Sequence, residues 1–96
     1  MAGTGGERTP RQRLFGDRMR ARRLDLGLTQ EEVAHRMGMD RAYVGALETG
    51  LRNPTLDTIG RVAVALGCGA AELVEGIERA KGRTRTGRRA RGPRRD

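Results

Sequence analysis

LTQEEVAHRMGMDRAYVGALETG, residues 28–50, is the stretch of sequence that decides the fold. It predicts two short helices, over residues 30–37 and 41–49, with a turn between them. Thr29 stands where it can cap the first helix, and Glu32, three positions later, completes a capping box. The beginning of the first helix is therefore defined by neighbouring residues alone.

Two residues of the turn define the angle between these helices. Gly38 can adopt the left-handed conformation that commonly ends a helix. Asp40 can cap the helix that follows it. A short turn with both ends defined places the second helix on a corner of the molecule, where it is accessible to a DNA major groove.

Three more helices are predicted around this pair, over residues 12–26, over residues 56–66 after the capping Thr55, and over residues 70–79. A glycine follows each of the first two, and Gly76 interrupts the third. Apolar residues recur at helical spacing, whereas β-branched residues are scattered and never alternate. The chain is therefore predicted to be all-α, a compact five-helix domain.

The predicted core is small and aliphatic, because the chain has only two aromatic residues, Phe15 and Tyr43. Its members lie on one face of each predicted helix or plug the turn. The residues expected to face inward are Phe15, Met19, Leu26, Val33, Ala34, Met37, Met39, Val44, Leu47, Leu56, Ile59, Val62, Ala63, Leu66, Cys68 and Leu73.

The basic residues lie mostly at the two ends of the chain, which has a formal net charge of +8. Residues 81–96 hold eight Lys or Arg against one acidic residue, and residues 1–13 hold three Arg against one Glu. Residues 14–80 hold nine Arg against ten acidic residues and are nearly neutral. From composition, residues 1–11 are expected to be a disordered arm, residues 12–80 the folded domain and residues 81–96 a disordered basic tail.

The sequence argues against several functional classes. No segment approaches the ~20 apolar residues of a membrane span, and the N-terminus lacks the apolar core of a secretion signal. The single cysteine, Cys68, cannot form an internal disulfide, which together with these absences favours the cytoplasm. No Cys or acidic cluster stands at metal-binding spacing from His35, and no nucleophile–base pair is visible. We therefore expect no enzyme, no metal and no cofactor.

Residues 28–50 resemble the helix-turn-helix of the lambda-repressor-like family, which includes phage repressors and Cro and is often called XRE. The other matching segments are residues 16–20 with Arg23, 48–50, 52–56 and 63–67. So many matches in the correct order are more specific than one short motif. The resemblance implies a five-helix domain that binds double-stranded DNA as a homodimer and regulates transcription.

Two subgroups of this family remain open. Residues 40–44, followed by Arg52 and Asn53, look like the small controller proteins of restriction–modification systems. Residues 44–47 look like the base-reading helix of the lambda repressor. The two likenesses disagree, so neither assigns the subgroup.

Four positions are predicted to face the bases of the DNA. Arg41 opens the second motif helix, where its guanidinium can donate two parallel hydrogen bonds to guanine. The alternatives are a phosphate contact and a solvated side chain. Ala42, Gly45 and Ala46 complete this surface and offer no side-chain hydrogen bonds. Either alanine can touch a thymine methyl group, and Gly45 lets the helix approach closely. Sequence preference is therefore expected to depend partly on DNA shape.

Polar residues around this surface are predicted to contact phosphates. By the family resemblance, Gln30 does so at the start of its helix, where the helix N-terminus also favours an anion. The other candidates are Tyr43, Thr49, Arg52 and Asn53. The alternatives are that Gln30 is a solvated residue at the helix start, that Tyr43 packs on the preceding helix and that Asn53 forms the turn before the next one.

Two further pairs of residues are predicted to hold structure together. The family counterparts of Arg23 and Glu48 form a largely buried ion pair that joins the first helix to the third. On the last predicted helix, Leu73 is expected to pack inward, while Val74 and Ile77 are expected to be exposed and to form a twofold dimer contact. For Val74 and Ile77, packing against the first helix is the alternative.

The sequence thus predicts a transcriptional regulator, such as a repressor, that inserts residues 41–49 into the major groove. The alternative is an antitoxin, which binds a toxin protein as its partner and represses its own operon, since many antitoxins share this fold. A third possibility is that residues 81–96 bind DNA or RNA without sequence preference.

Overall fold

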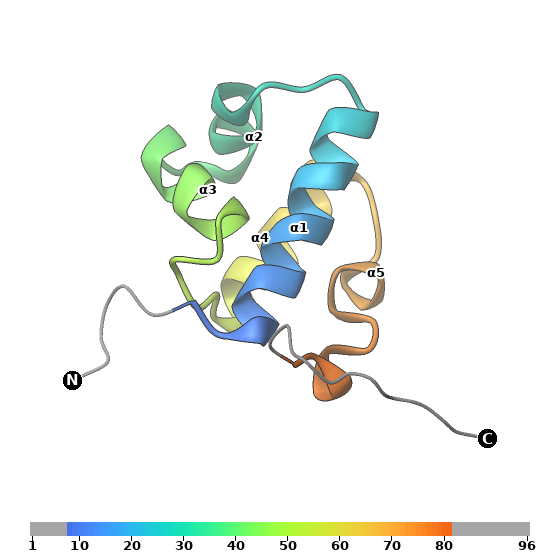
Figure 1. Cartoon of the computed structure of the whole chain (residues 1–96). Helices are drawn as coiled ribbons and strands as arrows, with labels where there is room; N and C mark the ends of the chain where they lie inside the picture. Colours follow the sequence, from blue (N-terminus) through green and yellow to red (C-terminus); the bar gives the residue numbers. More distant parts are fainter. Residues whose placement is uncertain (1–7, 82–96) are drawn as a thin grey trace.

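The computed structural model describes residues 8–81 and is all-α over that range (Figure 1). In chain order the elements are α1 (Pro10–Asp25), α2 (Gln30–Met37), α3 (Arg41–Glu48), α4 (Leu56–Leu66), α5 (Ala70–Val74) and a single 3-10 turn, η1 (Ile77–Arg79). Five α-helices, with no strand among the described residues, confirm the predicted fold class. Most of the predicted arm and basic tail lies outside the described residues.

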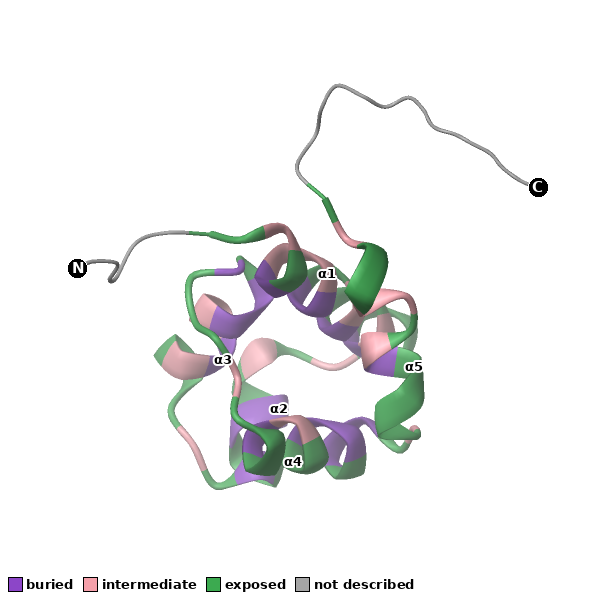
Figure 2. Ribbon diagram, turned by 90° about the horizontal axis from the view of Figure 1, so that it is seen from below, coloured by how far each residue is buried: buried purple, intermediate pink, exposed green. Residues whose placement is uncertain are grey.

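Helix α1 is the central element of the fold. α3 and α5 lie against it, while α2 packs against both α3 and α4, and α4 meets α5 (Figure 1). The buried segments of these helices face a common interior (Figure 2). The core residues are Phe15, Met19, Val33, Ala34, Met37, Val44, Leu47, Val62, Ala63, Ala65, Leu66 and Leu73.

The corner between α2 and α3 forms largely as predicted. Thr29 Oγ1 accepts a hydrogen bond from the Glu32 backbone N–H (3.0 Å), and the Thr29 N–H donates to Glu32 Oε1 (2.8 Å), which completes the capping box. Gly38 ends α2 with a φ of 70°. The predicted side-chain cap by Asp40 is wrong, because its carboxylate makes no capping hydrogen bond with the first turn of α3.

Helix α1 begins at Pro10, so the predicted boundary at residue 12 is wrong. The Thr9 hydroxyl accepts a hydrogen bond from the Gln12 N–H (3.1 Å) and caps the helix. Proline is favoured at the first helical position, where an N–H would have no partner. Pro10 and Arg11 therefore belong to the domain.

The predicted helix over residues 70–79 is wrong in its second half. α5 ends at Val74, and Gly76 adopts a φ of 74° before η1 begins. Glycine takes this left-handed conformation at little cost, so the chain turns here instead of continuing the helix. Arg11 of α1 then anchors the turned segment by donating from Nε to the Ile77 carbonyl oxygen (3.0 Å).

Two leucines that were expected in the core are exposed. Leu26 follows the last turn of α1 and is 43% exposed, and Leu56 at the start of α4 is 88% exposed. The buried face of α4 contains Thr58 and Ala65 instead. Successive helical residues are about 100° apart, so Thr58 points nearly opposite to Leu56 and only one of them can face the core.

Candidate nucleic-acid interface

Helix α1 positions α3 through a close approach of the two backbones. Gly16 lies so near the end of α3 that an added Cβ would overlap the carbonyl oxygens of Leu47 and Glu48. Beside it, the buried side chain of Gln12 donates from Nε2 to the Gly50 carbonyl oxygen (2.9 Å). A larger residue at position 16 would push the helices apart, so these contacts determine where the outer face of α3 lies.

A buried ion pair also joins α1 to α3. Arg23 donates from Nε to Glu48 Oε2 (2.6 Å) and from Nη2 to Glu48 Oε1 (3.0 Å). The two side chains are 10% and 1% exposed. The hydrogen bonds to Glu48 raise the pKa of Arg23, against the opposing effect of burial. A third bond from Arg23, from Nη1 to the Leu28 carbonyl oxygen (2.8 Å), secures the approach to α2.

Gln30, which was predicted to contact a phosphate, is attached to this ion pair. Its Nε2 donates to Glu48 Oε1 (3.1 Å). Its side chain also lies beside α3, because a Cβ added at Gly45 would be 3.6 Å from Gln30 Oε1. The ion pair therefore orients the first side chain of α2 as well as joining α1 to α3.

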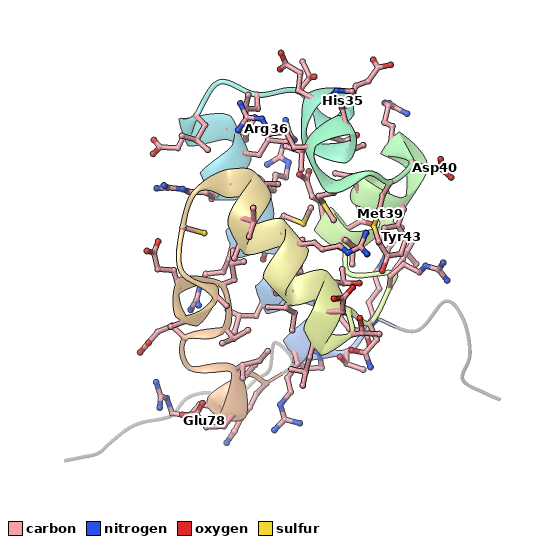
Figure 3. All side chains as sticks on the ribbon, turned by 180° about the vertical axis from the view of Figure 1, so that it is seen from behind. His35, Arg36, Met39, Asp40, Tyr43 and Glu78 are labelled. Atoms are coloured by element: carbon pink, nitrogen blue, oxygen red, sulfur yellow. The ribbon has the colours of Figure 1, made fainter. Side chains whose placement is uncertain are left out.

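The four predicted base-facing residues lie on the outer side of α3. Arg41 and Ala42 are exposed, whereas Gly45 and Ala46 are half-buried. The groove beside them is lined by Gly38, Met39, Asp40, Ala42, Tyr43, Ala46 and Arg52. Figure 3 shows the labelled residues of this groove, Met39, Asp40 and Tyr43, at one edge of the molecule. Among the four predicted positions, only Arg41 carries side-chain hydrogen-bond donors.

Tyr43 and Arg52 lie together in this groove. The guanidinium carbon of Arg52 is 5.3 Å from the centroid of the Tyr43 ring, which is within the range of a cation–π contact. The Tyr43 hydroxyl lies 3.4 Å from Thr58 Oγ1 on α4. The hydroxyl is therefore directed toward α4, and the ring supports Arg52.

The remaining predicted phosphate contacts, Thr49 and Asn53, lie in different surroundings. Thr49 is exposed directly after α3, and its hydroxyl donates to the Ala46 carbonyl oxygen (3.3 Å). Asn53 is also exposed, but it lines a separate hollow with Pro10 of α1 and Ile77 of η1. The structure therefore brings Arg52 to the groove beside α3 and places Asn53 at another one.

Acidic side chains stand near the beginnings of both motif helices. Glu32 in the first turn of α2 and Asp40 before α3 are both exposed. The hydrogen bond from the Thr29 backbone N–H lowers the pKa of the Glu32 carboxyl, which favours its charged form. Arg41 at the start of α3 and Arg52 after it, both exposed, carry the opposite charge.

Gln12 and Thr58 position other residues in ways that the sequence does not predict. Gln12 holds Gly50 across 38 residues, and Thr58 contacts Tyr43 across 15. The available signal is their position in the sequence. Gln12 lies three residues before Phe15, and Thr58 lies four residues before Val62, so each polar residue occupies a core-facing position on its helix. A polar side chain at such a position needs a hydrogen-bond partner, but its identity is not local information.

Residues 8–81 contain neither a metal-binding cluster nor a membrane-spanning helix. No group of three or more His, Cys, Asp or Glu side chains in that range is placed to hold a metal ion. No helix within it is long and apolar enough to cross a membrane. Cys68 is half-buried, and this burial raises the pKa of its thiol.

The two motif helices and the contacts that hold them define a helix-turn-helix domain. Residues 19–73 match the family model described as helix-turn-helix. The chain belongs to this family, which is the lambda-repressor-like or XRE family. The resemblance inferred from residues 28–50 is therefore confirmed.

Proteins similar to this chain are named as a transcriptional regulator, a control protein and a controller protein. An uncharacterized HTH-type transcriptional regulator of Sinorhizobium fredii is 44% identical over 63 residues, covering 66% of this chain and 82% of that protein. The control protein C.BamHI of Bacillus amyloliquefaciens is 35% identical over 63 residues, covering 65% of this chain and 78% of that protein. The crystal structure of the restriction–modification controller protein C.AhdI from Aeromonas hydrophila has a TM-score of 0.63 and 44% identity, covering 65% of this chain and 94% of that one.

Proposed function

We propose that the protein is a sequence-specific DNA-binding regulator of transcription that acts as a homodimer in the cytoplasm. The relatives named as a transcriptional regulator and as controller proteins support this proposal. The observation that carries it is the division of α3 into two faces. One face is buried and bound to α1 through Glu48, and the other presents Arg41 and Ala42 to solvent.

Arg41 is the residue that we propose selects a base. It stands at the N-terminal end of α3, the end of a recognition helix that contacts base edges. A guanidinium can donate two parallel hydrogen bonds to guanine O6 and N7. Ala42 and Ala46 provide apolar contacts for thymine methyl groups, while Gly45 allows close approach. DNA shape then supplies the rest of the preference.

Contacts to the DNA backbone are proposed for residues that border this face. Gln30 is oriented by Glu48 at the start of α2, and Arg52 is supported by the ring of Tyr43. Thr49 is exposed at the end of α3. Since Asn53 lies at a different hollow, we assign it to the turn before α4 and not to the phosphate border.

A homodimer would place two copies of α3 in successive major grooves, about 34 Å apart. Val74 and Ile77 were predicted to form the dimer contact, and both side chains are half-buried. Val74 packs partly against its own core, and Ile77 lines the hollow beside Phe15. These contacts support the alternative, and we propose that both side chains pack within the chain.

Repression is the output that the described domain supports by itself, because a protein on an operator excludes other proteins from the same DNA. The antitoxin alternative gains no support from these relatives, which are named as regulators or controllers. Nonspecific binding by residues 81–96 concerns a segment that lies almost wholly outside the described residues.

Selection from random duplex DNA with the full chain tests the proposal. We expect enrichment of two related half-sites in opposite orientation, one helical turn or a multiple of it apart. Footprinting should then show protection at both half-sites. Binding without any enriched sequence, or enrichment that survives deletion of residues 30–49 as a segment, would contradict it.

A further inference from the structure

The outer face of α4 carries an apolar stripe that the domain itself does not cover. Leu56 is 88% exposed and Val64 is 83% exposed, the highest values among the large hydrophobic side chains described. Gly60 lies midway between them, so the three residues follow one another along a single face of the helix. A shallow groove runs beside this stripe toward Met37 of α2.

We infer that this stripe is a self-association surface, at which Leu56, Gly60 and Val64 of one copy meet the same residues of a second copy. This inference deepens the proposed function, because it names the contact that joins two DNA-binding domains. It also gives a reason for the exposure of Leu56, which the helical pattern had assigned to the core.

The charges beside the stripe favour a second copy of this chain as the occupant. Arg61 donates from Nε to Asp57 Oδ2 (3.0 Å), and both side chains remain largely accessible, at 49% and 77% exposure. Asp57 and Arg61 lie on the same flank of the stripe. A twofold rotation that crosses two such helices at Gly60 brings Asp57 of one copy near Arg61 of the other. The surface is therefore complementary to itself, as an isologous contact requires.

The middle of the stripe permits a close crossing. Nothing lies within 4 Å of the position that a Cβ on Gly60 would occupy. Packed helices approach to about 8–10 Å, depending on the side chains at the crossing, and a glycine there adds no bulk. Leu56 of each copy can then reach Val64 of the other on either side of the crossing point.

The position of α4 is compatible with DNA binding by both copies. Seen from behind, α4 (yellow) crosses the near side of the molecule, while Asp40 and Tyr43 lie at its right-hand edge (Figure 3). Contact through α4 therefore leaves the outer face of α3 uncovered. A twofold axis that lies in the contact plane and runs toward the DNA would direct both α3 helices to the same side.

Sedimentation equilibrium of the full chain tests the inference. Leu56→Asp and Val64→Asp each place a charge at the contact, and we expect each to weaken self-association at least about tenfold. Leu24→Asp is the matched control, since Leu24 is an exposed leucine (51%) on α1. Thermal melting should show that all three variants remain folded. If both α4 variants associate as strongly as the control does, the inference is wrong.

A charge exchange gives an independent test that a merely destabilised variant could not pass. Asp57→Arg alone and Arg61→Asp alone each make the flank single-signed, so each variant should associate more weakly than the natural chain. An equal mixture of the two variants should recover association, because positive and negative flanks then meet. Equal self-association of both single variants and the mixture would overturn the twofold arrangement.

DNA titration separates failure of this contact from failure of the proposed function. With a duplex from the selection experiment, Leu56→Asp should lose affinity for two half-sites but retain the binding of a single half-site. If the natural chain showed no sequence preference, the regulator proposal would fail, and sedimentation would still decide whether α4 joins two copies. Preferential DNA binding together with unchanged association of Leu56→Asp would place the dimer contact elsewhere.

Discussion

The inner face of α3 is held by side chains that have defined partners, whereas the outer face presents one arginine among small residues. On the inner side, Glu48 binds Arg23 and Gln30, and Gly16 admits the backbone of α3 at close range. On the outer side, Ala42, Gly45 and Ala46 offer no side-chain hydrogen bonds. The difference indicates that many residues of this sequence determine where α3 lies, whereas few determine which bases α3 would recognise.

Removing the carboxylate of Glu48 should have the largest effect. Glu48→Ala leaves the guanidinium of Arg23 buried without its partner, and breaking a buried pair in this way costs on the order of 3–5 kcal/mol. The free energy of unfolding in urea should fall by about that amount. DNA binding should weaken as well, since Gln30 loses the acceptor that orients it.

The exposed ion pair between Arg79 and Glu78 provides the control for this measurement. Those side chains are 70% and 67% exposed, and exposed pairs contribute roughly 0–1 kcal/mol. Glu78→Ala should therefore leave unfolding nearly unchanged. Similar losses of stability in Glu48→Ala and Glu78→Ala would show that the inner face is not specially constrained.

Removing the arginine of the outer face should act on DNA binding and leave the fold intact. Arg41→Ala is expected to weaken binding to the selected operator by ~1–3 kcal/mol and to relax the preference at one base position. Competition titration against random DNA measures this, with Arg20→Ala, an exposed arginine on α1, as the matched variant. Equal losses on operator and random DNA would reassign Arg41 to a phosphate.

Adding one methyl group at Gly45 or at Gly16 compares the outer and inner faces of α3. Alanine is favoured over glycine inside a helix by roughly 0.5–1 kcal/mol. At Gly45 the added Cβ would meet Gln30 Oε1 at an ordinary 3.6 Å, so Gly45→Ala should raise the free energy of unfolding by up to about that amount. On the proposed interface, the same methyl group should weaken operator binding.

Gly16→Ala should do the opposite to stability, because its Cβ would overlap two backbone carbonyl oxygens of α3. Urea unfolding of the two variants side by side distinguishes the faces. If Gly45→Ala strengthened both folding and operator binding, close approach of α3 to DNA at this residue would be excluded.

The capping box should give the smallest effect, visible as a dependence on pH. The pKa of Glu32 is lowered from its ordinary value of 4.5 by hydrogen bonds with Thr29. The folded protein therefore binds this proton less readily than the unfolded chain does. The stabilisation is present above the ordinary pKa and is lost as the pH falls through the lowered one.

Melting temperatures of the natural chain and Glu32→Gln should reveal this sign. The variant should melt slightly lower at pH 7, and the difference should shrink toward pH 3. A difference that grew on acidification would mean that the charged form of Glu32 does not stabilise the start of α2.

Much of the fold could be predicted because its signals are local. The capping box of Thr29 with Glu32 and the left-handed Gly38 involve residues that are near neighbours in sequence. Local signals predict the wrong structure where the same residue is compatible with two conformations. Gly76 could have been tolerated within a helix, yet it turns the chain, and Asp40 precedes a helix without capping it.

The residues of the candidate site could be predicted from the sequence, but most of the contacts between them could not. Arg41 and Arg52 could be selected as cations near the motif, but the ring of Tyr43 beneath Arg52 is a contact across the fold. Asn53 adjoins Arg52 in sequence and nevertheless lines a different hollow. Neighbours in a loop can face opposite ways, and spacing along the chain does not reveal which.

The sequence by itself determined the family, most helix boundaries and the identity of the corner, since caps and helical periodicity act over about four residues. Only the tertiary structure decided that Gln30 joins the ion pair of Arg23 and Glu48, and that Leu56 is left outside the core. Both outcomes depend on which side of a helix meets its neighbours. The rotation of each helix about its own axis decides which side that is. Because distant segments set this rotation by packing together, no single segment of sequence determines it.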